Sequence, residues 1–148
     1  MIMKRLDFNI DINAPREKVW NILWNDSTYP QWTSPFSPES RVKTDWKKGS
    51  KALFHDGTDN GMVATIADNI PNEYMSIKHL GMLKDGKEDM EEAQREGWTG
   101  AMENYTLAST NGRTQLHIEV DTLEKHLDFF TKVWPKALEK VKQLAESN

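Results

Sequence analysis

The 148-residue sequence contains no cysteine, which excludes disulfide bonds, thiolate nucleophiles and cysteine metal ligands. It has no hydrophobic run long enough to span a membrane, and its first residues, MIMKRLDFNIDI, lack the apolar core of a signal peptide. The missing cysteines fit a reducing compartment. We therefore expect a cytoplasmic protein without a membrane span.

Basic charge is also scarce, because 19 Lys and Arg stand against 23 Asp and Glu, a net charge of −4. This balance gives no field that would attract phosphate backbones, so we expect no nucleic-acid partner. Phosphate-binding glycine loops, a G-x-S-x-G elbow and metal-binding histidine pairs are missing as well. We expect no cofactor and no metal.

Tryptophan, by contrast, is abundant, with six in a chain of this length. Two interpretations are open. The aromatic rings build a large core, or they line a pocket for an apolar ligand. Composition alone favours the core. The six are Trp20, Trp24, Trp32, Trp46, Trp98 and Trp134.

The first third of the chain predicts one strand and two short helices. Residues 4–12 alternate apolar and polar side chains, which is typical of a strand with one wet face. Asn13-Ala14-Pro15 then offers a helix start, and residues 16–24 carry apolar side chains at helical spacing. A second small helix or turn is expected around residues 29–32.

The middle of the chain predicts an antiparallel meander, because short strand patterns are separated by turn signals. The clearest turn is Asn111-Gly112, which is typical of a two-residue hairpin. The predicted strands are 41–46, 51–55, 62–67, 74–80, 97–108 and 115–121.

Residues 84–96, KDGKEDMEEAQRE, interrupt this meander with a strongly charged stretch. The stretch is long for a hairpin loop, so we expect a mobile excursion or one short exposed helix. Its role is either that of a solvated loop or that of a lid over a pocket.

The C-terminal residues, 129–148, predict the strongest helix, although Pro135 lies inside it. The proline marks a boundary between two helices or a kink in one. The apolar stripe favours one kinked helix, since it stays in phase on both sides of Pro135, which lies off it. The kink either curves the helix around the sheet or, with Trp134 beside it, widens a pocket near Thr131. The stripe contains Leu127, Phe130, Trp134, Leu138, Val141 and Ala145.

A curved sheet with one apolar face needs a cover, and the last helix is the only predicted element long enough to provide it. We found no repeat, linker or low-complexity segment. The sequence therefore predicts a single α+β domain over residues 1–148.

Several local patterns, in their order along the chain, resemble the START-related helix-grip superfamily (SRPBCC), which includes polyketide cyclases and the birch pollen allergen. Within it, the chain is similar to homologues of the heat-shock protein 90 ATPase activator. The patterns are Ile12-Asn13-Ala14-Pro15 with Val19-Trp20, Gln31-Trp32, Trp46 with Gly49, Gly61-Met62-Val63 through Pro71, and the Asn-Gly hairpin leading to Trp134 and Leu138.

The resemblance implies a six- or seven-stranded antiparallel sheet wrapped around the C-terminal helix, with a cavity between them. Members of the superfamily bind lipids, sterols, polyketides or other apolar molecules, and a minority catalyse reactions on them. The chaperone-activator members bind a protein partner instead. Two departures are the length of the 84–96 stretch and the proline after Trp134.

Two polar residues are candidates for an interior site. Glu103 faces inward if Tyr105 does, by strand alternation, and a carboxylate in an apolar cavity could orient a ligand or transfer protons. The opposite assignment puts it in water. His79 shares the parity of Met75 and Ile77, as a satisfied interior histidine or a catalytic one.

The favoured function is binding of a small apolar or amphipathic ligand between sheet and helix. One alternative is an interaction protein that regulates a chaperone ATPase. Another is a cyclase or hydratase that uses Glu103, Tyr105 or His79 for proton transfer. A non-enzymatic role is favoured. The predicted cavity residues are Trp20, Trp32, Phe54, His79, Trp98, Glu103, Tyr105, Phe130 and Trp134.

Overall fold

A computed structural model describes residues 3–147, so Met1, Ile2 and Asn148, which the single-domain prediction includes, lie outside the described residues. The elements follow the predicted order of a strand, two short helices, a run of strands and one long helix. They are β1 (Met3–Ile12), α1 (Arg16–Trp24), α2 (Tyr29–Trp32), β2 (Arg41–Lys43), β3 (Lys51–His55), β4 (Gly61–Ile70), β5 (Tyr74–Lys84), β6 (Lys87–Asp89), α3 (Glu91–Glu96), β7 (Ala101–Thr110), β8 (Arg113–Leu123), η1 (Glu124–His126) and α4 (Leu127–Glu146).

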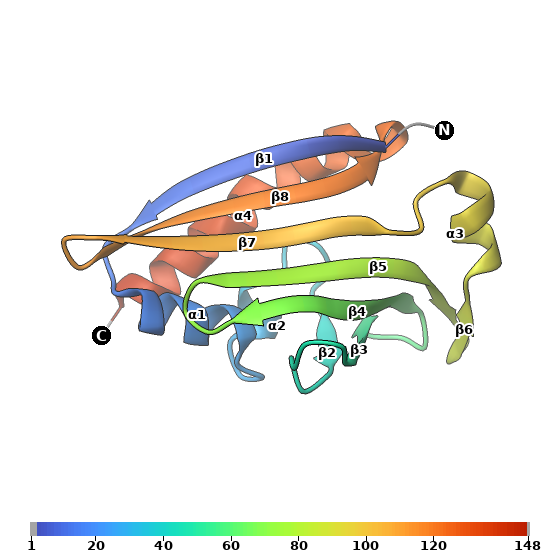
Figure 1. The fold of residues 1–148 in the computed structure, drawn as a ribbon, viewed down its shortest axis with the longest axis horizontal. Helices are drawn as coiled ribbons and strands as arrows, with labels where there is room; N and C mark the ends of the chain where they lie inside the picture. Colours follow the sequence, from blue (N-terminus) through green and yellow to red (C-terminus); the bar gives the residue numbers. More distant parts are fainter. Residues whose placement is uncertain (1–2, 148) are drawn as a thin grey trace.

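The strands form one antiparallel sheet, and α4 runs across one of its faces (Figure 1). Their spatial order is β1-β8-β7-β5-β4-β3-β2, and the short β6 pairs with β5 beside this path. The α+β helix-grip prediction is confirmed, with seven strands in the main path and β6 in addition. None of the helices within residues 3–147 is both long and apolar enough to cross a membrane.

Two local features shape the sheet. The register between β4 and β5 shifts at Val63/Ala64 and at Ile66/Asp68, and such bulges bend and twist a strand. The β7–β8 hairpin closes at Asn111 and Gly112, whose φ angles of 52° and 78° fit the mirror-image turn predicted from this dipeptide.

The core fills the space between α4 and the facing side of the sheet. Met75 and Ile77 of β5 and Ile118 of β8 are fully buried against it. Helix α4 contributes the predicted stripe, of which Trp134, Leu138, Val141 and Ala145 are buried. The sheet and α4 therefore enclose one continuous apolar core.

Helix α4 continues through Pro135 without interruption, as the single-helix interpretation predicted. Pro135 is exposed and lies beside Ser34 and Pro35 in a shallow groove on the outer side of the helix. Its position leaves the buried stripe intact, so α4 tolerates the missing backbone donor without losing core contacts.

The charged stretch 84–96 is ordered secondary structure and not a loop excursion. Asp85 and Gly86 have φ angles of 51° and 78° and connect β5 to the unpredicted β6, and the predicted short exposed helix follows as α3. Gly81 permits this close packing, because a Cβ atom there would lie 2.7 Å from the Asp89 carbonyl oxygen.

Candidate functional site

A cavity of about 560 Å³ lies between the sheet, the α2 region and the first turns of α4. Its wall is mostly apolar and aromatic. Eight of the nine predicted residues belong to this wall, while their contact with a ligand stays a prediction. The eight are Trp32, Phe54, His79, Trp98, Glu103, Tyr105, Phe130 and Trp134.

Trp20, the ninth, does not line the cavity. It lies on α1 and packs edge-on against Trp24, with the ring centroids 6.0 Å apart. Trp24 is buried and contacts both Trp46 and Tyr105 at centroid distances of 4.7 Å. Helix α1 packs against α4. Trp20 therefore lies beside an aromatic core cluster and outside the cavity.

The cavity reaches α4 beside Thr131 but not at Thr131 itself. Thr131 is exposed and does not line the cavity, which contacts α4 through Phe129, Phe130 and Trp134. The reason is helical phase, because Phe130 and Trp134 lie four residues apart on the inward side of α4. Pro135 is likewise not part of the cavity wall.

Sequence reasoning missed several wall residues. Tyr29 is the first residue of the helix that carries Trp32, and it packs edge-on against Trp32 at 5.5 Å between ring centroids. Phe36 lies 4.9 Å from Trp134 by the same measure. The signal was the aromatic density of the YPQWTSPF segment. Others in the wall are Met62, Met82 and Phe129.

A polar cluster is part of the otherwise apolar wall. One oxygen of the Glu103 carboxylate lies 3.0 Å from His79 Nε2, and the other accepts a hydrogen bond from the Tyr105 hydroxyl. Glu103 is opposite Ile77 of β5 and Val120 of β8, so strand alternation directs it inward. The inward assignment of Glu103 is the one adopted in the structure.

The tyrosines beside Glu103 keep their protons at neutral pH. Burial raises the pKa of Tyr105 well above its usual value, and the Glu103 charge and hydrogen bond raise it further. Burial and then the Glu103 charge also raise the pKa of Tyr29. Both hydroxyls are therefore neutral donors. Within residues 3–147, His79 Nδ1 and Trp134 Nε1 are buried without a hydrogen-bond partner.

Helix α3 borders the outer part of the cavity, where Glu92 and Glu96 belong to the lining. The Glu96 carboxylate lies 2.7 Å from Lys125 Nζ of η1, and Lys84 pairs with Glu92. These ion pairs fix α3 to the neighbouring elements at the mouth of the cavity.

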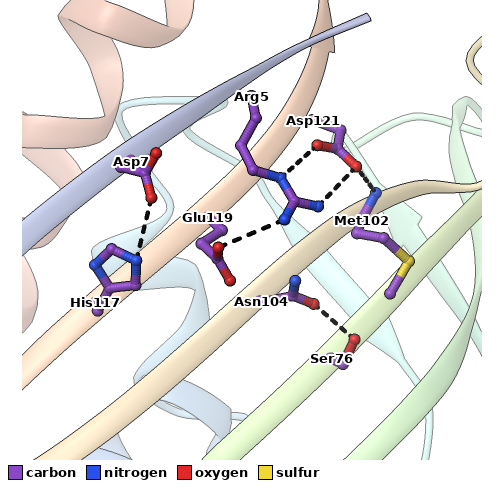
Figure 2. A network of polar contacts seen from close by, with 8 residues as sticks. All are labelled: Arg5, Asp7, Ser76, Met102, Asn104, His117, Glu119 and Asp121. Carbon is purple, nitrogen blue, oxygen red and sulfur yellow. Dashed lines mark hydrogen bonds and ion pairs between the residues drawn. The ribbon is translucent and has the colours of Figure 1, made fainter.

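The outer face of the sheet carries a second polar cluster, drawn in Figure 2. Arg5 binds Asp121 and Glu119, and His117 Nε2 lies 3.2 Å from Asp7. His117 and Glu119 are about one-third exposed. Asp7, His117 and Glu119 lie close enough to hold a cation, but the Arg5 and histidine contacts already account for their charges.

Solved structures with the same fold include several at low sequence identity. The Aha1 dimer from Colwellia psychrerythraea is 21% identical with a TM-score of 0.71, and the match covers 99% of this chain and 97% of that one. A protein from Cytophaga hutchinsonii is 23% identical with a TM-score of 0.70 and the same coverage. CalU16 from Micromonospora echinospora is 17% identical, with a TM-score of 0.69 and coverage of 97% and 75%. At these identities the likeness establishes the fold.

A search of curated proteins found no match. The model of the family described as Activator of Hsp90 ATPase homolog 1-like protein matches residues 13–146, nearly the whole chain. The match agrees with the helix-grip architecture and with the resemblance noted in the sequence. The chain therefore belongs to the family of Activator of Hsp90 ATPase homolog 1-like proteins, within the START-related helix-grip superfamily.

Proposed function

We propose that the protein binds a small apolar or amphipathic molecule in the cavity between the sheet and α4. The observation that supports this most directly is the cavity itself, with about 560 Å³ of space and an aromatic wall. Burial of about 200 Å² of apolar ligand surface contributes about 5 kcal/mol before association costs, which is enough for useful affinity. Within this proposal the chain acts as one domain in the cytoplasm.

A neutral fluorescent dye such as Nile red tests the proposal. We expect its emission to rise on binding and to fall when an apolar competitor is added. Met62→Trp fills the cavity and should abolish the response, whereas Ile70→Trp adds the same side chain at a position 44% exposed and should not. Dye that stays unbound, together with native mass spectra that show no ligand after purification, would refute the proposal.

Regulation of a chaperone ATPase is the second candidate, and the family match to residues 13–146 favours it. The protein would then bind the chaperone of its host and change its rate of ATP hydrolysis. A pull-down combined with an ATPase assay tests this directly. Failure to bind and an unchanged rate would end this hypothesis, while leaving ligand binding in the cavity untouched.

Catalysis is the third candidate, favoured by the chain of contacts from His79 through Glu103 to Tyr105. A carboxylate between a histidine and a tyrosine can take up and return protons in a cyclase- or hydratase-type reaction. Glu103→Gln is the discriminating change, because it keeps the shape and removes the base. If it leaves the turnover of every screened substrate unchanged, the acid–base role is excluded.

A further inference from the structure

We infer that the cavity selects an organic cation, an amine carried on an apolar or aromatic body. This inference rests on the proposed ligand-binding function and adds the chemical class of the ligand. It follows from the charges of the cavity wall, from the pairing of each carboxylate and from the aromatic rings around Glu103, the inner-face carboxylate that lacks a Lys or Arg partner among residues 3–147.

Carboxylates outnumber cations in the wall. Arg41 is the single Lys or Arg among the lining residues, all of which belong to residues 3–147, and it is exposed. Five acidic residues border the cavity, and the carboxylates of three of them have a Lys or Arg partner. The five are Asp56, Glu92, Glu96, Glu103 and Asp121; the three pairs are Glu92 with Lys84, Glu96 with Lys125, and Asp121 with Arg5, the last of which lies on the outer face of the sheet.

Two lining carboxylates lack a Lys or Arg partner among the described residues. Asp56 is exposed and accepts from the Thr58 amide and hydroxyl, so Glu103 is the one on the inner face of the sheet. Glu103 contacts His79 and the neutral hydroxyl of Tyr105. A carboxylate has about four acceptor positions, of which these contacts use two. Its side chain retains 19% exposure in the cavity wall, so acceptor positions remain for a ligand.

The rings near Glu103 favour the same kind of ligand. Tyr29, Trp32 and Phe54 line the same cavity, and Tyr29 lies 5.5 Å from Trp32 and 6.4 Å from Phe54 between ring centroids. The negative faces of aromatic rings attract cations and repel anions. An ammonium group would contact the rings and donate to Glu103, whereas a carboxylate ligand such as a fatty acid anion would face repulsion from both.

Three ligands with one carbon skeleton test the inference by calorimetry: 2-(2-naphthyl)ethylamine, 2-(2-naphthyl)ethanol and 2-naphthylacetate. We expect the amine to bind at least about tenfold more tightly than the alcohol, and the carboxylate to bind most weakly. Equal affinities, or a carboxylate that binds most tightly, would overturn the inference. Because this series uses the unaltered protein, it does not depend on any variant folding.

Glu103→Gln then assigns the preference to one residue. Glutamine keeps the size of the side chain and an acceptor for the Tyr105 hydroxyl, so the affinity of the alcohol should not change. The amine should lose at least about tenfold in affinity. The matched control is Glu96→Gln, a lining carboxylate that Lys125 already neutralises, and it should keep the preference for the amine. If both variants lose the preference equally, Glu103 is not its source and the inference is wrong.

Nile red separates this inference from the proposed function. If the dye binds and the three naphthyl ligands displace it without a preference for the amine, the ligand-binding proposal stands and the cation inference is overturned. Dye and ligands that all fail to bind refute both. Binding of the dye with displacement in the order amine, alcohol, carboxylate supports both.

Discussion

Each face of the sheet carries a carboxylate, on adjacent strands, but the two carboxylates have different kinds of partner. On the outer face, Asp121 accepts from Arg5 Nε at 2.8 Å and from the Met102 backbone amide at 2.9 Å (Figure 2). On the inner face, Glu103 contacts a histidine and a tyrosine, its only hydrogen-bond partners among residues 3–147, and borders an open cavity. Outer polar groups thus pair with one another, whereas the inner carboxylate has acceptor positions left over.

The difference separates the sources of stability from the source of binding. Outer ion pairs are partly exposed, so each contributes little to the free energy of unfolding. The inner face gains its stability from burial of aromatic and aliphatic side chains, and the polar cluster within it is the part that a ligand can use. Substitutions on the two faces should therefore differ in what they change.

Trp134→Ala should have the largest effect on stability, because it deletes a ring at the centre of the inner face. Trp134 is 3% exposed and packs against Phe8 and Phe36. We expect the free energy of unfolding to fall by about 3–5 kcal/mol, measured by urea denaturation. Lys132→Ala, at an exposed position of the same helix, should change it by less than about 0.5 kcal/mol. A loss below about 1 kcal/mol at Trp134 would show that the inner face is not the main source of stability.

Asp121→Asn should have a smaller and pH-dependent effect. Burial alone would raise the pKa of Asp121, but the hydrogen bonds from Arg5 and the Met102 amide outweigh it and hold the pKa below its ordinary value. A carboxyl group whose pKa is lowered by folding contributes stability above its unfolded pKa of about 3.9, and the contribution is lost as the pH falls through the folded pKa.

We therefore expect Asp121→Asn to lower the free energy of unfolding by about 1 kcal/mol at pH 6. The difference from the unaltered protein should shrink below about pH 4. Urea denaturation at pH 6 and pH 3 measures it. Glu119→Gln is the matched control on the same strand, because its contact with Arg5 is longer, at 3.4 Å, and its loss should cost less. A difference that stays constant from pH 6 to pH 3 would contradict the ion-pair account.

Strand alternation predicted much of the candidate site. It placed His79 with Met75 and Ile77, and it linked the direction of Glu103 to that of Tyr105. Strand alternation could not predict the contact between His79 and Glu103. This contact depends on the pairing of β5 with β7, which brings Ile77 opposite Glu103. Pairing between strands distant in sequence is decided by the whole sheet and leaves no local pattern.

Helical spacing was less informative about where the cavity ends. Trp20 and Trp24 lie one turn apart on α1, so they share a face, and neither lines the cavity. Tyr29 and Phe36 were missed because the four-residue α2, with Pro30 inside it and Pro35 after it, gives no periodic pattern. The hairpin to β6 was missed although Asp85-Gly86 is a turn signal, because charged residues surround it and conceal the strand.

Lys125→Ala should have the smallest effect on stability. It tests whether α3 acts as a lid over the cavity. The 2.7 Å contact from Lys125 to Glu96 joins η1 to α3 at the mouth of the cavity, and both side chains are partly exposed. Urea denaturation should therefore show no measurable change.

If α3 moves aside to release a ligand, loss of this contact should speed dissociation severalfold, measured by stopped-flow displacement of Nile red. Lys132→Ala removes a lysine from an exposed position on α4 outside the cavity wall and should leave the rate unchanged. An unchanged rate in Lys125→Ala would make α3 a fixed part of the wall, so that ligands would have to pass beside it, past Phe129 and the start of α4.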